Sequence, residues 1–274
     1  MNPSRITELL DPFLDRANGQ RLTTNDLSSI STYIDILQHW NARVNLTAIR
    51  NEEEIVTRHF GESLFTARYL FPRDKHLGTA DPKRSEAEIT VAEGDREGHG
   101  FSRANSTPQK SAALTTEGHS RRFSPRSSAS SALNGFEVAD LGSGAGFPGI
   151  PIKLWAPEIK LTLIESNHKK ATFLREVVRA LTLTDVDIQN TRAESLRNVS
   201  FNVVTLRAVE RFDSILPVAS NLISPEGRLA LLIGQSQLPR AQSILPTLLP
   251  TLTWPAIVPI PHSESRVLAI ATPT

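Results

Sequence analysis

The chain has 274 residues, no cysteine and a formal net charge of +1, from 30 Lys and Arg against 29 Asp and Glu. This length can hold one large α/β domain with an appendage, or two small domains. The lack of cysteine excludes disulfides and thiolate chemistry, and it suits a cytoplasmic protein. The charge balance excludes nucleic-acid binding through overall charge, so any basic surface must be local. No apolar stretch approaches the roughly 18 residues of a membrane span, so we expect no membrane partner.

Residues 1–72 predict a small helical extension. Apolar residues recur at helical spacing after Thr24 and Asn25, either of which can cap that helix. A second helix is predicted over 52–70, because Asn51 can cap it and three glutamates in its first turn favour the helix dipole. The first residues carry early acidic side chains and a helical apolar period, so we interpret them as mature sequence rather than as a targeting peptide.

Residues 73–135 differ in composition from the rest of the chain. They are rich in Gly, Ser, Thr, Arg and Pro, hold few bulky apolar residues and show no sustained period. This composition predicts a disordered insertion. The second half of the segment is basic, so an arm that touches RNA is an alternative to a solvated linker.

Residues 136–274 alternate strand and helix patterns. This alternation predicts a mostly parallel sheet with helices on both faces. The last two strands are joined by a short turn, so they must be antiparallel neighbours. The predicted strands lie within residues 136–141, 160–166, 186–191, 201–208, 227–234, 254–261 and 265–273.

A glycine-rich loop, within "VADLGSGAGFPGIPIK", follows the first of these strands and precedes a helix. Gly142, Gly144 and Gly146 therefore lie at the carboxyl edge of the sheet, where doubly wound folds bind ligands. Glycines there let backbone N–H groups approach a ligand closely. The dinucleotide pattern G-x-G-x-x-G fails because Phe147 stands in the third glycine position, which disfavours a dehydrogenase.

Two acidic residues narrow the class of ligand. Asp140 stands at the end of the first strand, where it would repel a pyrophosphate but could accept a hydrogen bond from an ammonium group or orient the loop. Glu165 ends the second strand, about 20 residues beyond the loop, where an acid can bind both hydroxyls of a ribose. A surface glutamate is the alternative for Glu165. Together the two residues favour a nucleoside with an amino-acid tail.

The loop resembles motif I of the class I S-adenosylmethionine-dependent methyltransferases, and Glu165 resembles their ribose-binding acid. The predicted final hairpin is similar to the end of that family's sheet. The resemblance implies an α/β, Rossmann-like fold with a seven-stranded, mostly parallel sheet whose last strand is antiparallel, plus the N-terminal helical extension. It also implies S-adenosyl-L-methionine as methyl donor, without a metal.

The chemistry of the acceptor narrows the type of methyltransferase. Cytosine C5 methylation generally uses a cysteine nucleophile, which this chain lacks. Adenine-N6 enzymes typically carry a Pro-Pro motif after the fourth strand, and no Pro-Pro occurs here. An acceptor with a free lone pair, such as guanine N7, needs no base, so positioning could supply most of the rate.

Longer segments resemble one family, the bacterial 16S ribosomal RNA guanine-N7 methyltransferases, also called small-subunit methyltransferase G. The resemblance covers residues from about 25 to 72 and from about 136 to 235. It implies methylation of N7 of a guanine in the decoding-region loop, with 16S rRNA or the small ribosomal subunit as partner of a monomer. The matching segments are "WNARVNLTAIRNEEEIVTRHFGESL", "GSGAGFPGIPIKLWAPEIKLTLIESNHKKATFLREV", "TRAESL" and "FNVVTLRAV".

The resemblance also implies roles for single residues near the cofactor. Gly142, Gly144 and Phe147 match the loop that holds the methionine part and the adenosine. Ala193 and Glu194 match the segment that meets the adenine.

Arg207 matches the family's arginine at the end of the fourth strand, beside the cofactor and the target base. A guanidinium there could stack on or hydrogen-bond to the flipped guanine, or contact a phosphate. Because the product base is cationic, we expect Arg207 to orient the acceptor rather than to stabilise the growing charge.

Residues of the extension are candidates for contact with the RNA. Arg43 and Asn45 could face it, and so could His59, although a lone histidine on a helix is commonly structural and a solvated helix face explains Arg43 equally well.

The sequence departs from the family pattern at two positions besides the insertion. Ile233 precedes Gly234 where the family usually has a lysine near the substrate, and Glu62 stands where aspartate is common. Two alternatives therefore stay open: a methyltransferase that acts on a small molecule or a protein, and a non-catalytic protein that binds S-adenosylmethionine.

Overall fold

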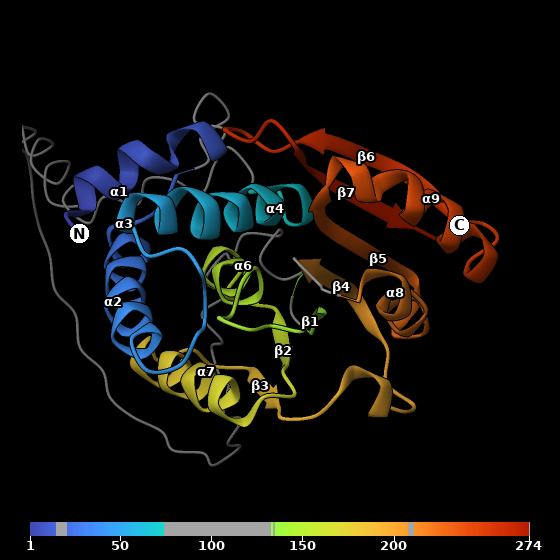
Figure 1. Cartoon of the computed structure of the whole chain (residues 1–274), viewed down its shortest axis with the longest axis horizontal. Coiled ribbons are helices and arrows are strands. Elements are labelled where there is room, and N and C mark those ends of the chain that lie inside the picture. Colours follow the sequence, from blue (N-terminus) through green and yellow to red (C-terminus); the bar gives the residue numbers. More distant parts are fainter. Residues whose placement is uncertain (15–20, 74–132, 134, 208–210, 274) are drawn as a thin grey trace, which may run out of the picture. The chain divides into compact units, whose positions relative to one another are not determined.

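In the computed structural model, which describes residues 1–14, 21–73, 133, 135–207 and 211–273, seven strands form one sheet. The sheet order is β3-β2-β1-β4-β5-β7-β6 (Figure 1). The strands are β1 (Glu137–Leu141), β2 (Lys160–Ile164), β3 (Val186–Gln189), β4 (Phe201–Arg207), β5 (Ile223–Gly234), β6 (Thr253–Pro259) and β7 (Arg266–Thr272).

The strand directions confirm the predicted fold class. β1 pairs in parallel with β2 and β4, β2 with β3, and β4 with β5. The last strand, β7, is antiparallel to both β5 and β6. The chain runs outward from β1 to β3 and then returns to the other side of β1 as β4, so the carboxyl ends of β1 and β4 form the switch point where such sheets bind ligands.

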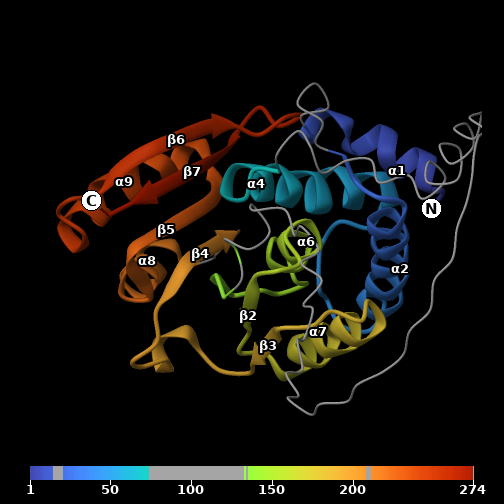
Figure 2. The same cartoon turned by 180° about the vertical axis from the view of Figure 1, so that it is seen from behind.

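Helices cover both faces of the sheet, as seen from the front in Figure 1 and from behind in Figure 2. On one face, side chains such as Val138 and Val203 share a buried cluster with α6 (Gly149–Trp155) and α7 (His168–Ala180). On the other face, alternate residues such as Ala139 and Val204 pack with α8 and α9. This alternation follows from the two-residue period of a strand. The bounds of the second pair are Phe212–Asn221 for α8 and Leu238–Leu248 for α9.

The N-terminal extension is helical, as predicted. Its elements are α1 (Pro3–Leu10), η1 (Asp11–Phe13), α2 (Thr24–Asn41), α3 (Glu52–Glu54), the π-helical segment η3 (Ile55–Gly61) and α4 (Glu62–Leu70).

One cap differs from the expectation and one agrees with it. The cap of α2 is Thr23, not Thr24 or Asn25: its hydroxyl accepts from the Asp26 N–H at 3.1 Å, and the Asp26 carboxylate accepts from the Thr23 N–H at 2.8 Å. Only Thr23 has an acid three residues further on, so only Thr23 can close this reciprocal box. Asn51 caps the second helix as predicted, since its side chain accepts from the Glu54 N–H at 3.0 Å.

The extension does not stand apart from the sheet. Ile34, Phe60 and Leu64 belong to the same buried cluster as Ile150 of α6 and Phe173 of α7. Met1–Gly78 and Ser128–Thr274 accordingly form one unit of the chain. The insertion predicted over 73–135 lies almost entirely outside the described residues.

We expect Gly61→Ala to destabilise the protein by about 1–3 kcal/mol, because overpacking a buried site is costly. A Cβ at Gly61 would lie 2.6 Å from the ring of Phe13. The Gly61 backbone is helical, so without this contact alanine would stabilise the helix by about 1 kcal/mol. Urea unfolding measures the change, and Phe13→Leu in the same chain should recover part of the loss. A more stable Gly61→Ala protein would contradict this packing.

Candidate functional site at the carboxyl edge of the sheet

The glycine loop after β1 combines open space with tight packing. Gly142, Gly144 and Gly146 have φ values of +69°, +57° and +83°, a region that side chains disfavour. A Cβ on Gly142 would meet nothing within 4 Å, and on Gly144 only a carbonyl at 3.7 Å. A Cβ on Gly146 would instead collide with the hydroxyl of Tyr33. The first two glycines therefore leave room above the loop, while the third lets the loop pack on α2.

Asp140, which was expected either to bind an ammonium group or to orient the loop, bonds to the elements on both sides of the loop. Its carboxylate accepts from the Thr205 hydroxyl at 2.7 Å and from the Gly149 N–H at 3.2 Å. The side chain is buried, and burial raises the pKa of Asp140 to about 6 against the opposing effect of these hydrogen bonds. The residue thus ties β4 and the start of α6 to the end of β1.

Glu165 lies at the end of β2 and contacts the same loop. One carboxylate oxygen accepts from the Gly144 N–H at 2.9 Å, and the other from the Asn167 N–H at 2.7 Å. Each oxygen keeps a further lone pair that could accept from a hydroxyl group. The structure therefore brings the glycine loop and the acid together, as the sequence predicts.

Phe147, which the resemblance assigns to the cofactor loop, packs its ring against the N-terminal extension. Its ring stacks on Tyr33 at 5.2 Å between centroids and on His59 at 4.7 Å, with Phe60 edge-on at 5.1 Å. Both faces of the ring are covered by the chain itself, and the residue is 6% exposed. In this structure Phe147 joins the extension to the loop.

The segment after β3 also lies at the carboxyl edge of the sheet. Ala193 is buried and Glu194 is exposed in the three-residue turn η4 (Ala193–Ser195). Sequence reasoning missed Asn190, whose amide donates to the Glu165 carbonyl at 2.9 Å and so fixes the end of β3 against the end of β2.

Arg207 ends β4 with its side chain 7% exposed, and its hydrogen-bond partners come from the extension. Nη1 donates to His59 Nδ1 at 3.1 Å. Nη2 donates to the Arg58 carbonyl at 2.6 Å and to Glu62 Oε2 at 3.1 Å. Burial lowers the pKa of Arg207 to about 10, against the attraction of Glu62, so the side chain stays cationic at neutral pH.

His59 is an uncharged acceptor in this arrangement. An arginine nitrogen can only donate, so His59 Nδ1 accepts and Nε2 carries the proton, which it donates to Thr47 Oγ1 at 2.8 Å. Burial, reinforced by Arg207 and two further arginines, lowers the pKa of His59 to about 2.

The predicted RNA residues occupy two environments. Arg43 and Asn45 are exposed on the loop that follows α2, whereas His59 is buried beneath it. Asn41, a second residue that sequence reasoning missed, fixes this loop. Its side chain accepts from the Leu46 N–H at 2.9 Å and donates to the Thr47 carbonyl at 2.9 Å.

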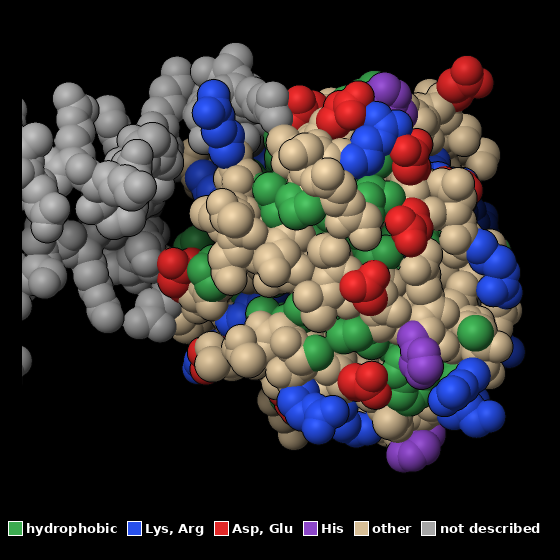
Figure 3. Space-filling model, turned by 90° about the vertical axis from the view of Figure 1, so that its left-hand side faces the viewer, with side chains coloured by type: hydrophobic (Ala, Val, Ile, Leu, Met, Phe, Trp, Pro, Cys, Tyr) green, Lys and Arg blue, Asp and Glu red, His purple; other side chains and the backbone are tan. Residues whose placement is uncertain are grey.

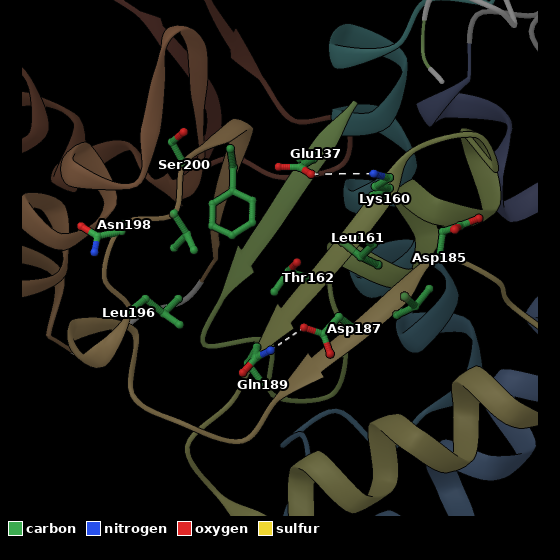
Figure 4. Close-up of a pocket in the computed structure, with 13 residues that line it drawn as sticks. Glu137, Lys160, Leu161, Thr162, Asp185, Asp187, Gln189, Leu196, Asn198 and Ser200 are labelled. Atoms are coloured by element: carbon green, nitrogen blue, oxygen red, sulfur yellow. Dashed lines mark hydrogen bonds and ion pairs between the residues drawn. The ribbon is translucent and has the colours of Figure 1, made fainter. Parts of the chain in front are cut away.

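A hollow of about 710 Å³ lies elsewhere, over β1, β2 and β3 (Figure 4). Thr162, Asp187 and Gln189 point into it, and the Gln189 amide donates to the Asp187 carboxylate. Its lining includes no glycine of the loop and not Arg207. We therefore place the candidate site at the carboxyl edge, where Glu165 bonds to the glycine loop and Arg207 ends the neighbouring strand β4.

In the part of the chain that the structure describes, no cluster of three or more His, Cys, Asp or Glu side chains could hold a metal ion. None of the described helices combines the length and hydropathy needed to cross a membrane.

The chain is similar in sequence to one family of known proteins. The family model for rRNA small subunit methyltransferase G matches residues 26–81 and 121–243. The protein of that name from Xylella fastidiosa strain 9a5c is 32% identical over 203 residues, which cover 74% of this chain and 66%, just under two thirds, of that relative. Its counterpart from Roseiflexus sp. strain RS-1 is 30% identical over 263 residues, which cover 93% of this chain and 86% of the relative.

Among solved structures, the ribosomal protein L11 methylase from Lactobacillus delbrueckii subsp. bulgaricus has a TM-score of 0.45 and 17% sequence identity, covering 52% of this chain and 72% of that chain. The fold assignment rests on the sheet order and strand directions.

His59 should make the protein less stable as the pH falls. Its pKa is lowered to about 2 from 6.5, so below pH 6.5 the unfolded chain binds a proton that the folded protein does not. Asp140 has the opposite effect on stability, because its pKa is about 6 in the folded protein and 3.8 when unperturbed. The effect of His59 is therefore measured as a difference between two proteins that both contain Asp140. We expect the stability advantage of the wild type over His59→Asn to shrink by about 2 kcal/mol from pH 7 to pH 5. Urea unfolding at both pH values tests this, and a constant gap would contradict it.

Two alanine substitutions should separate the roles of the loop glycines. Gly146→Ala should destabilise the fold strongly, because its Cβ collides with Tyr33 and lies 2.7 Å from Ile150. Gly144→Ala should cost only about 1–2 kcal/mol of backbone strain but weaken binding of S-adenosylmethionine, because its Cβ enters the open space above the loop. Thermal unfolding and titration calorimetry measure the two effects. If folded Gly144→Ala binds S-adenosylmethionine with unchanged affinity, the cofactor does not bind in the space above this loop.

Proposed function

Because the chain belongs to the rRNA small subunit methyltransferase G family, we propose that it transfers a methyl group from S-adenosylmethionine to small-subunit rRNA, at N7 of a guanine in the decoding-region loop of 16S rRNA. The observation that carries the proposal is the convergence of the open glycine loop, Glu165 and Arg207 at one edge of the sheet.

The cofactor would be held by the residues at this edge. The open space above Gly142 and Gly144 suits the amino-acid part, and the free lone pairs of Glu165 suit the ribose hydroxyls. Ala193 and Glu194 are proposed to border the adenine. When bound, S-adenosylmethionine supplies an electrophilic methyl group on a sulfonium ion.

His59 and Asp140, two of the ionisable groups at this edge, are poorly placed to take a proton from the acceptor. The lone pair of His59 Nδ1 is already used by Arg207, and the low pKa of His59, about 2, makes it a poor base. The Asp140 carboxylate is buried and already accepts two hydrogen bonds. Guanine N7 carries a free lone pair, so a site that positions the base without deprotonating it suits this acceptor.

Contact with the RNA would be local. Figure 3 shows that acidic and basic side chains are interspersed on one face of the protein rather than forming one basic surface. Arg43, Asn45 and Arg50 are exposed on a loop that Asn41 orders and that Thr47 connects to His59 and hence to Arg207. The target base would have to reach this edge unstacked from its neighbours.

Arg207→Ala should lower methyl transfer by about 100-fold or more, because a misplaced acceptor loses most of the rate that orientation supplies. The assay uses 30S subunits from cells that lack the enzyme, a radiolabelled methyl donor, and N7-specific cleavage to map the modified base. Arg240→Ala is a matched control, because Arg240 is exposed and pairs with Asp213 on the surface. A wild type that binds the cofactor but leaves every guanine unmodified would overturn the RNA assignment.

A further inference from the structure

One oxygen of Glu62 holds two arginines from different strands. Glu62 is the first residue of α4, and its side chain is 3% exposed. Oε2 accepts a hydrogen bond from Arg207 Nη2 at 3.1 Å and forms an ion pair with Arg266 Nη2 at 3.0 Å. Arg207 ends β4, and Arg266 begins β7 opposite Gly234 of β5, so the carboxylate joins the extension to two strands.

Strand alternation explains why both arginines reach the extension. Val203 faces the buried cluster that contains the extension, so Arg207, four residues further along β4, faces it too. Leu268 faces the same cluster, so Arg266 also points there. Two guanidinium groups therefore converge on a carboxylate that the first turn of α4 presents.

The charges around Glu62 do not balance. Arg207 and Arg266 contribute two positive charges and Glu62 one negative charge, while His59 is uncharged. The side chain of Arg58 pairs with Glu54 outside this cluster, at 3.2 Å. Arg207 Nε is buried and has no hydrogen-bond partner among the described residues. The guanidinium of Arg207 is thus held at both terminal nitrogens, while its Nε–H has no partner among the described residues.

We propose that Glu62 is a positioning residue that sets the guanidinium of Arg207 for methyl transfer, with Arg266 fixed by the same oxygen. This proposal rests on the proposed function. Arg58, His59 and Glu62 lie within two turns of one helical segment and offer three acceptors to one rigid donor fork. Three fixed hydrogen-bond acceptors select one rotamer of the long Arg207 side chain, and Glu62 is the charged acceptor among them. Loss of the Glu62 carboxylate would therefore let Arg207 move away from the base that is methylated.

The simpler alternative is that Glu62 only ties the extension to the sheet. Removing one partner of a buried ion pair destabilises a protein in either case. Lower activity alone would therefore not separate the two roles. The readout must show that Glu62 acts through Arg207.

The test compares Glu62→Gln in the wild type and in an Arg207→Lys background, by kcat and KM for 30S subunits, affinity for S-adenosylmethionine, and thermal unfolding. We expect Glu62→Gln to lower kcat by about 30-fold or more in the wild type and by less than about 3-fold in Arg207→Lys, since coupled residues are not additive. Cofactor affinity should change by less than about 3-fold, because the Glu62 carboxylate bonds to Arg207 and Arg266 rather than to the glycine loop. Glu53→Gln is the matched control, because it breaks an exposed ion pair with Arg5 in the same extension.

A second variant keeps the test decisive if Glu62→Gln does not fold. Glu62→Gln with Arg266→Gln removes one charge of each sign, so the cluster keeps its net charge while Arg207 loses its carboxylate partner. The same fall in kcat is expected. Wild-type kcat in either folded variant, or an equal fall in both backgrounds, would overturn the positioning role. Absence of methylation by the wild type would instead overturn the proposed function, and the positioning role with it.

Discussion

The stacking of Phe147 between Tyr33 and His59 is the contact on which the rest of the site depends. Phe147 belongs to the loop after β1, Tyr33 to α2 and His59 to the π-helical segment, so three distant parts of the chain meet in one column of rings. Aromatic rings in such contacts bury large apolar areas and prefer defined geometries. The stack therefore holds the glycine loop against the extension, and the Tyr33 hydroxyl adds a hydrogen bond to the Ala145 carbonyl.

The same contact places the helix turn that holds Arg207. His59 stacks on Phe147 and accepts a hydrogen bond from Arg207. The Arg58 carbonyl and Glu62, which lie on either side of His59 in the chain, accept from the same arginine. Burial then sets the protonation states: His59 is kept neutral and Arg207 remains charged. Arg207 is thus a fixed cation and His59 a fixed acceptor at this edge of the sheet.

Much of the fold could be predicted because its signals are local. Strand and helix periods located the sheet and its helices, the short final turn predicted the antiparallel pair, and Asn51 marked a helix start. The cap of α2 was misplaced by one residue, because the reciprocal bond from Asp26 decides among three neighbouring polar residues. The glycine loop, Glu165 and Arg207 lie at the carboxyl edge where the sequence placed them, and Phe147 and His59 are buried where the extension meets the loop.

The sequence by itself determined the order of strands and helices, the glycine loop and its position at the carboxyl edge, because side-chain period and the need for positive φ are properties of short segments. Only the tertiary structure decided which partners each functional side chain has. Arg207 and His59 are 148 positions apart, and Arg207 and Glu62 are 145 apart. Their meeting depends on which face of β4 the extension covers, and that follows from the packing of the whole buried cluster rather than from any local pattern.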